Sequence, residues 1–318
     1  QWNAWLQGKY TDLESLKAAW GQELKADETL GSVQPAKDTA QRGNPRLHDW
    51  QLFREHLADQ WVQRQVRVLR HVDPAHMITV GYIQWSFPVI RPGDPHIYSA
   101  FNPRRQAEWL DFISIHFYPL MGRPYGSKSN WDRNLAYLQN VLAYCHVGKP
   151  VVLGEYGWYG GGAPKGRPYL TEDEQARWIT AEVEASRQLA QGWLSWPFAD
   201  TPEATDMSVY GGMVMHNHGK KLWGLRFRSY AAALFMLPQP TPELPSFDTS
   251  ASLTAPLDDL TAMHEEYTKL VQAALAQAGP PPEIELQTMP LEKDQFEALK
   301  QRQEQRRREY LRQMKRRR

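Results

Sequence analysis

The stretch KPVVLGEYGWYGGG, Lys149 to Gly162, decides the fold, because a short apolar run within it leads directly to a single carboxylate. The run Val151–Leu153 is continuous and aliphatic, as expected of a strand that is buried on both faces. Pro150 and Gly154 mark its two ends. Glu155 then stands at the carboxyl end of the strand, where a charge is costly to desolvate unless it is used. In parallel α/β barrels this end of the strands carries the chemistry.

Aromatic residues crowd the loop that contains Glu155. Tyr156, Trp158 and Tyr159 offer flat apolar rings, on which the C–H faces of sugar rings can stack. Two interpretations of Glu155 stay open at this point. It is either a catalytic carboxylate beside a sugar-binding surface or a buried glutamate paired with an arginine at a strand end.

Helix-then-strand units repeat around this strand. The patterns predict strands at residues 77–82, 111–117, 151–154 and 192–198. Amphipathic helices are predicted before, between and after them, at residues 49–72, 104–110, 131–146, 171–190 and 221–234. Such alternation favours a parallel sheet built of βα units. A closed (β/α)8 barrel needs eight strands of this kind, of which this chain supplies four.

The two ends of the chain lack the helix-then-strand repeat. Residues 2–20 read as helical with a turn at residues 8–11, and residues 21–45 read as a long loop. After residue 237 the segment PQPTPELP is a proline-rich linker. Helices are predicted at residues 256–278 and 291–318, the latter with 11 Lys and Arg against 5 Asp and Glu. This basic tail is either an arm for an acidic partner or membrane surface, or a solvated helix.

Composition narrows the function classes. The formal charge of the 318 residues is +1 and residues 291–318 carry a net +6, so the remaining residues carry −5. This mildly acidic main part lacks the positive charge that nucleic-acid-binding proteins carry. The single cysteine, Cys145, excludes an internal disulfide and a cysteine-based metal cluster. No apolar run reaches the ~18 residues of a membrane span, and no signal peptide is visible. The cellular compartment is left open.

Polar, titratable or aromatic residues stand at the carboxyl ends of all four predicted strands. In chain order these are Gln84 and Trp85, His116 and Tyr118, Glu155, and Trp193 and Trp196. A single histidine or tryptophan at such a place is more often a packed core residue. The joint pattern predicts a concave site at this face of the sheet.

These residues carry a resemblance to the clan A glycoside hydrolases, especially family 5, the cellulase and β-mannanase family. The motifs are His116-Phe117-Tyr118, Gly154-Glu155-Tyr156-Gly157 and a tryptophan, Trp196, in the order of strands six, seven and eight of that family. The opening WNAWLQGKYTDLESLKAAWG is similar to a segment that follows strand four in family 42 β-galactosidases. Residues 212–227 resemble the end of family 5 barrels.

The resemblance implies retaining hydrolysis of a β-linked oligo- or polysaccharide, without a cofactor or a metal. Glu155 matches the nucleophile, Tyr118 would hold it ionised, and His116 would contact the sugar or a second carboxylate. Trp196 would lie beneath the sugar, with Trp158, Trp85 and Trp193 as further substrate-binding residues. The predicted partner is therefore a carbohydrate substrate.

One departure from the family pattern concerns the acid/base. The family places it in an Asn-Glu pair that ends strand four, and this chain contains no Asn-Glu pair. We therefore expect residues 1–237 to be the C-terminal half of the barrel, with strands five to eight. The missing N-terminal half would supply the acid/base. Residues 238–255 are expected to be a linker and residues 256–318 a helical, basic tail.

Several alternatives remain open from the sequence. A non-catalytic carbohydrate-binding pseudoenzyme would keep the aromatic residues without the chemistry, and a scaffold could act through the basic tail. A loop carboxylate, Glu23, Glu28 or Asp38, could replace the acid/base, although such groups are usually just solvated. His216 and His218 have the spacing of a weak metal site at best.

Overall fold

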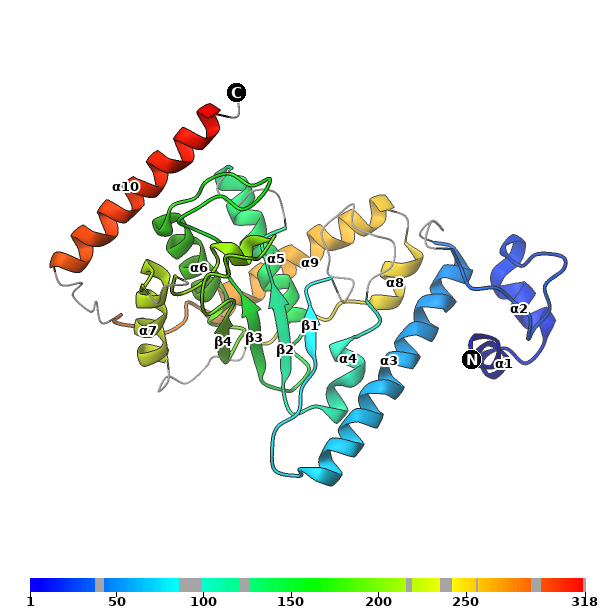
Figure 1. Ribbon diagram of the computed structural model, residues 1–318. Coiled ribbons are helices and arrows are strands. Elements are labelled where there is room, and N and C mark those ends of the chain that lie inside the picture. Colours follow the sequence, from blue (N-terminus) through cyan, green and yellow to red (C-terminus); the bar gives the residue numbers. More distant parts are fainter. Residues whose placement is uncertain are drawn as a thin grey trace. The chain divides into compact units, whose positions relative to one another are not determined.

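The structure is a computed structural model, which describes residues 1–37, 43–85, 99–120, 126–215, 219–234, 242–255, 257–286 and 293–316. The chain divides into two compact units, each made of several chain segments. The first contains residues 1–114, 140–150 and 244–274, and the second contains residues 115–139, 151–243 and 275–318. Each unit is considered separately below, with the labels of Figure 1.

Helices dominate the first unit. It begins with α1 (Trp2–Lys9), α2 (Leu13–Trp20), the short η1 (Gly21–Glu23) and the long α3 (Pro45–Val72). Asp12 caps α2 by accepting from the backbone N–H of Ser15. Apolar side chains from these helices and the loop at residue 33 form one core of Trp2, Leu6, Leu16, Trp20, Val33 and Phe53.

The rest of the first unit carries β1 (Gly81–Ile83), α4 (Pro103–Gln106), η2 (Ala107–Trp109), α8 (Thr249–Thr254) and most of α9 (Leu257–Ala278). The strand is shorter than the predicted residues 77–82. The reason lies at its start, where the Ile78 N–H donates to the Asp111 carboxylate at 2.6 Å instead of to a neighbouring strand. Cys145, the one cysteine, is buried and free.

The second unit contains the βα repeats that the sequence predicts. Its strands are β2 (Ile113–Phe117), β3 (Val151–Tyr156) and β4 (Gly192–Ser195), and its helices are α5 (Lys128–Tyr144), α6 (Glu172–Ser186), η3 (Met207–Val209), α7 (Leu222–Leu234) and α10 (Lys293–Arg316). The first two residues of β2 and the end of α5 belong to the first unit. The four strands have the order β1-β2-β3-β4, and β3 pairs with β4 in parallel. The predicted α/β class and strand order are confirmed.

One face of β3 and β4 is covered by helices. Tyr156 of β3 is fully buried and meets the Trp223 ring of α7 edge to face, at 6.3 Å between centroids. The Trp223 indole in turn donates to the Ser195 hydroxyl of β4 at 2.9 Å. The other face carries exposed apolar residues: Leu194 is 61% exposed and Phe198, beyond β4, is 67% exposed.

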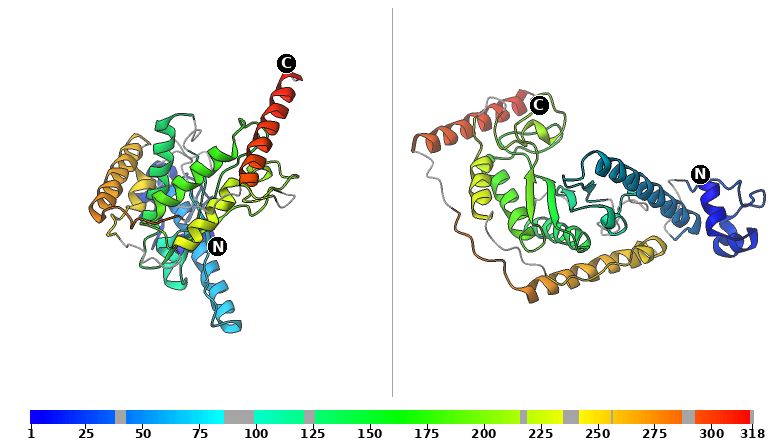
Figure 2. Two further views of the ribbon diagram at one scale, coloured as in Figure 1. Left: turned by 90° about the vertical axis from the view of Figure 1, so that its left-hand side faces the viewer. Right: turned by 90° about the horizontal axis from the view of Figure 1, so that it is seen from below.

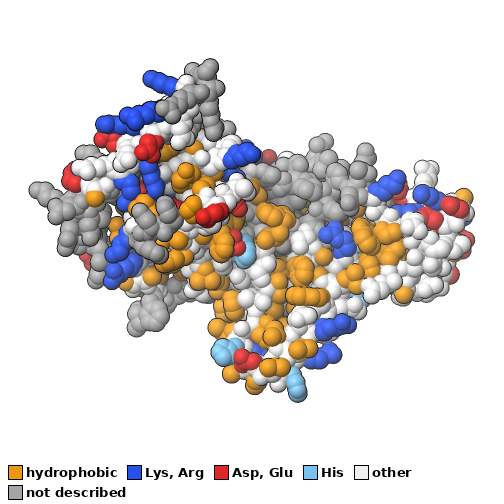
Figure 3. Space-filling model, in the orientation of Figure 1, with side chains coloured by type: hydrophobic (Ala, Val, Ile, Leu, Met, Phe, Trp, Pro, Cys, Tyr) orange, Lys and Arg blue, Asp and Glu red, His pale blue; other side chains and the backbone are white. Residues whose placement is uncertain are grey.

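The basic tail forms the long helix α10, which is part of the second unit (Figure 2). Arg302 donates to both carboxylate oxygens of Glu172, at 3.2 and 3.1 Å, and Glu172 is fully buried at the start of α6. Lys and Arg side chains line much of this helix, at the upper left of Figure 3. One face of this helix is therefore attached to α6, while most of its described side chains are exposed to solvent.

No helix among the described residues is long and apolar enough to cross a membrane.

Candidate active site

Glu155 lies at the carboxyl end of β3 with a partner on each of its oxygens. The Tyr118 hydroxyl donates to Oε1 at 2.5 Å, and Nδ1 of His116 lies 2.8 Å from Oε2. Both partners come from the end of β2, the strand before β3. The side chains of His116 and Glu155 are 29% and 25% exposed, so the carboxylate is held in place and is still reachable from solvent.

A bulge in β3 turns Glu155 towards this site. Leu153 is opposite Trp193 and Tyr156 is opposite Ser195, so three steps on β3 match two on β4. The extra residue lets Leu153 and Tyr156, both buried, share the helix-covered face. Glu155, which precedes Tyr156, therefore projects from the opposite face. Bulges often re-aim side chains beside active sites.

The Tyr118 hydroxyl keeps its proton at this site and therefore acts as a hydrogen-bond donor. Burial raises the pKa of its hydroxyl well above the usual value, and the hydrogen bond to Glu155 adds to the increase. A phenol that keeps its proton remains a hydrogen-bond donor to the carboxylate. Hydrogen bonds of this kind stabilise the charged form of a carboxylate.

The second glycine of the Gly-Glu-Tyr-Gly motif has a steric role. A Cβ at Gly157 would lie 2.5 Å from the Trp196 carbonyl oxygen, closer than any side chain tolerates. The loop after β3 thus passes directly against the end of β4. The Trp196 N–H also donates to the Tyr156 carbonyl at 2.9 Å, which extends the strand pairing to Trp196.

Trp196 is exposed on the side of the sheet to which Glu155 turns. Side chains on a strand alternate between faces, and Ser195 faces the helices. Trp196 therefore projects from the opposite face, where 50% of its surface is accessible. This position suits a stacking surface for a sugar.

Two of the predicted substrate-binding tryptophans lie elsewhere. Trp193 shares the helix-covered face with Leu153, and its indole donates to the Ser186 hydroxyl of α6 at 2.8 Å. Trp158 is only 6% exposed and packs against Tyr159 at 5.3 Å between ring centroids. Trp158 is thus a packed core ring, whereas Trp193 is turned towards α6 and is half-buried, and a substrate-binding role for either stays a prediction.

Trp85 follows β1 in the first unit and is 46% exposed, whereas Gln84 beside it is buried. A role for Trp85 in binding stays a prediction.

The three loop carboxylates that could replace the acid/base, Glu23, Glu28 and Asp38, differ in their surroundings. Burial raises the pKa of Glu28, but hydrogen bonds from Arg46 and from two backbone N–H groups outweigh it and bring the pKa to about 2. Such a firmly ionised, paired group is a poor proton donor. Glu23 is exposed in η1. Asp38, His216 and His218 lie outside the described residues. Among the residues that the structure does describe, no cluster of metal ligands is found.

Sequence reasoning missed Lys221 and Asp200, which hold the loops around the site. Lys221 is fully buried, and its ammonium donates to the carbonyls of Gly160 and Tyr210 at 2.9 and 2.7 Å and to Asp200 at 3.1 Å. Gly160 follows β3 and Tyr210 follows β4, so one side chain joins both loops. A lysine beside another lysine, Lys220, gives no sequence signal that it is buried.

Part of this chain is similar to a known family of glycosidases. Residues 1–157 match the model of glycoside hydrolase family 42, which is described as beta-galactosidase. This match spans both motifs that end at Tyr118 and Gly157. A sequence search of the curated proteins gives no match.

Solved structures share the fold. A β-galactosidase from the psychrophilic Marinomonas ef1 superposes with a TM-score of 0.52 at 15% identity, over 86% of this chain and 41% of that one. The β-galactosidase from Halorubrum lacusprofundi gives a TM-score of 0.50 at 16% identity, over 85% of this chain and 35% of that one. A family 5 enzyme from Streptomyces cattleya gives a TM-score of 0.48 at 18% identity, over 69% of this chain and 55% of that one.

The fold and these matches define a likeness: the chain has the parallel α/β sheet of the barrel glycosidases, and part of its sequence is similar to one of their families. Its first half, residues 1–157, is the part similar to the family 42 β-galactosidases. The chain spans about two fifths or less of the length of the β-galactosidases that it matches.

Proposed function

We propose that the protein takes part in retaining hydrolysis of a β-linked oligo- or polysaccharide, with Glu155 as the nucleophile. The observation that carries this proposal is the pair of partners on its carboxylate, with the Tyr118 hydroxyl on one oxygen and the His116 ring on the other. A nucleophile needs to be oriented and reachable, and this arrangement supplies both.

In the first step, a Glu155 oxygen forms a bond to the anomeric carbon while the bond from that carbon to the leaving oxygen breaks. A second carboxyl group gives its proton to the leaving oxygen. Water then attacks the anomeric carbon, the second group takes a proton from the water, and Glu155 leaves as a carboxylate. Tyr118 orients Glu155 between turnovers, because its hydroxyl donates to one oxygen of the carboxylate.

We place the second carboxyl group upstream of Gln1, in the first four strands of a full barrel. The chain has no Asn-Glu pair, and it aligns with only 35% to 41% of the two β-galactosidases. The four strands described here then correspond to strands five to eight. Family 42 similarity favours a β-galactoside as substrate over the cellulose-like or mannan-like substrates that family 5 resemblance implies.

The test compares two substitutions in the full-length protein. Glu155→Gln keeps the shape and removes the nucleophile, so kcat on aryl β-galactosides should fall on the order of 10⁴-fold or more, with little change in binding. Trp196→Ala should weaken sugar binding by about 1–3 kcal/mol, the scale of a lost aromatic contact. Retention of most activity in Glu155→Gln would remove this residue as the nucleophile.

A carbohydrate-binding pseudoenzyme is the second candidate, favoured by the absence of an Asn-Glu pair. It predicts the reverse ranking, with Glu155→Gln nearly silent in binding assays, Trp196→Ala severe, and no hydrolysis by the unmodified protein.

A further inference from the structure

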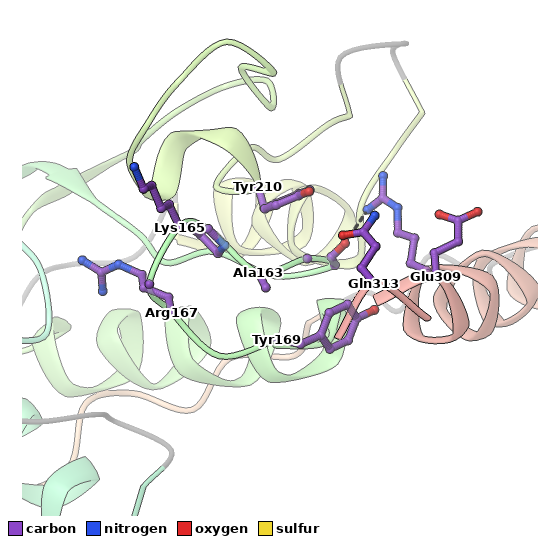
Figure 4. A pocket seen from close by; sticks show the side chains of 12 residues that line it. Ala163, Lys165, Arg167, Tyr169, Tyr210, Glu309 and Gln313 are labelled. Carbon is purple, nitrogen blue, oxygen red and sulfur yellow. Dashed lines mark hydrogen bonds between the residues drawn. The ribbon is translucent and has the colours of Figure 1, made fainter. Parts of the chain in front are cut away.

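A cavity of about 830 Å³ lies in the second unit, on the loop that leads away from Glu155 (Figure 4). Its walls come from three places: residues 161–169 between β3 and α6, Tyr210 at the end of η3, and α10. The helix contributes Arg306, Glu309 and Gln313, whose spacing of three and four places them on one helix face. This volume is in the range of small-molecule sites.

The walls of the cavity are firmly held. Gly162 and Leu170 form an antiparallel bridge that closes the loop, and the Tyr159 hydroxyl donates to the Pro168 carbonyl at 2.9 Å. Arg306 of α10 donates to the Gly161 carbonyl at 3.1 Å, which fixes the helix to the loop. A Cβ at Gly162 would lie 2.5 Å from the Tyr210 ring, so only glycine lets that ring rest on the loop backbone.

The charge in the cavity is positive and partly unpaired. Lys165, Arg167 and Arg306 line it against one carboxylate, Glu309. Arg306 lies 3.8 Å from Glu172, and Glu309 accepts a hydrogen bond from Gln305 of the same helix. Lys165 and Arg167 are exposed, and within the described ranges no carboxylate lies at ion-pair distance from either. Arg167 is steadied by the Trp158 ring, 5.1 Å away.

We propose that this cavity binds an anionic group, a carboxylate or a sulfate ester, carried by the glycan that the protein acts on. Lys165 and Arg167 pair with the anion, and the rings of Tyr169 and Tyr210 contact the sugar that bears it. The assignment of a glycan rests on the proposed function, because the same loop begins at the candidate nucleophile. The anion site itself rests on the cavity and its cations.

Binding in the Glu155→Gln background tests the proposal without hydrolysis. Three oligosaccharides of equal length serve as probes: a neutral galactan, a galacturonan and a sulfated galactan. One or both charged probes should bind about tenfold tighter than the neutral one, and added salt should reduce that preference. The stronger of the two charged probes identifies the anion.

A double variant locates the effect. Lys165→Gln with Arg167→Gln should abolish the preference and leave binding of the neutral galactan unchanged. The matched control, Arg133→Gln with Lys220→Gln, removes two exposed cations of the same unit that do not line the cavity, and should keep the preference. Equal binding of all three probes, or a preference that survives in the double variant, would overturn the proposal.

The two proposals can fail separately. Hydrolysis that persists in Glu155→Gln refutes the nucleophile and leaves the anion preference to be read in binding. A missing preference alongside inactive Glu155→Gln refutes only the anion site.

Discussion

Replacing Lys221 by Met should destabilise the second unit more than any substitution of an exposed charge. The change keeps the length and apolar stem of the side chain and removes its ammonium group. Three hydrogen bonds disappear, to the Gly160 and Tyr210 carbonyls and to Asp200. Asp200, only 5% exposed, is then left with the Gly212 N–H at 2.9 Å as a donor to its carboxylate.

The expected magnitude follows from this uncompensated burial. Removing one partner of a buried ion pair costs about 3–5 kcal/mol. With a slope of ~3 kcal/mol per molar urea, the unfolding midpoint should move down by about 1–1.7 M. The assay is urea denaturation followed by tryptophan fluorescence. Adding Asp200→Asn to Lys221→Met should recover part of the loss, since the buried carboxylate is then neutral.

The neighbouring lysine supplies the control. Lys220 is exposed, so Lys220→Met should leave the free energy of unfolding within about 0.5 kcal/mol of its original value. If Lys221→Met and Lys220→Met have the same midpoint, the ammonium does not hold the two loops together. That result would refute the reasoning and leave the rigidity of the anion cavity unsupported.

Three further predictions concern the site, the tail and the exposed sheet face. Because the pKa of Tyr118 is raised in the folded protein, its hydroxyl stays protonated near pH 10, where the same group has begun to ionise in the unfolded chain. Its contribution to stability is therefore lost as the pH rises above about 10. Tyr118→Phe should show a smaller loss of unfolding free energy between pH 9 and 11 than the original protein, and an equal loss would contradict this. Arg302→Ala leaves the buried Glu172 without its bidentate partner and should cost about 1–3 kcal/mol in urea denaturation, whereas the exposed Arg307→Ala should be neutral. The exposed Leu194 and Phe198 should make the isolated chain bind a hydrophobic dye, and a soluble, cooperatively melting monomer without dye binding would argue against an uncovered barrel flank.

Local signals in the sequence determined the elements of the second unit. The aliphatic run before Glu155 is β3, and Thr171 caps α6 with Glu174 as its capping-box partner. The residue types at the strand ends also placed Tyr118 and His116 near Glu155 in the predicted sheet, because the carboxyl ends of neighbouring parallel strands share one edge. These features depend on periodicity and caps over a few residues, which a single sequence displays.

Only the tertiary structure decided which side chains share the site. The bulge in β3 sends Glu155 to one face of the sheet, whereas Trp193, opposite Leu153 on the neighbouring strand, faces α6. Nothing in the sequence marks a bulge between Leu153 and Tyr156, so all strand-end tryptophans looked equivalent. The attachment of α10 likewise depends on the contact of Arg302 with Glu172, which lies 130 positions away in the sequence. The burial of Lys221 depends on contacts such as the one with Gly160, which lies 61 positions away. Such pairings leave no periodic pattern, because the energy of a buried charge depends on partners that the fold alone brings to it.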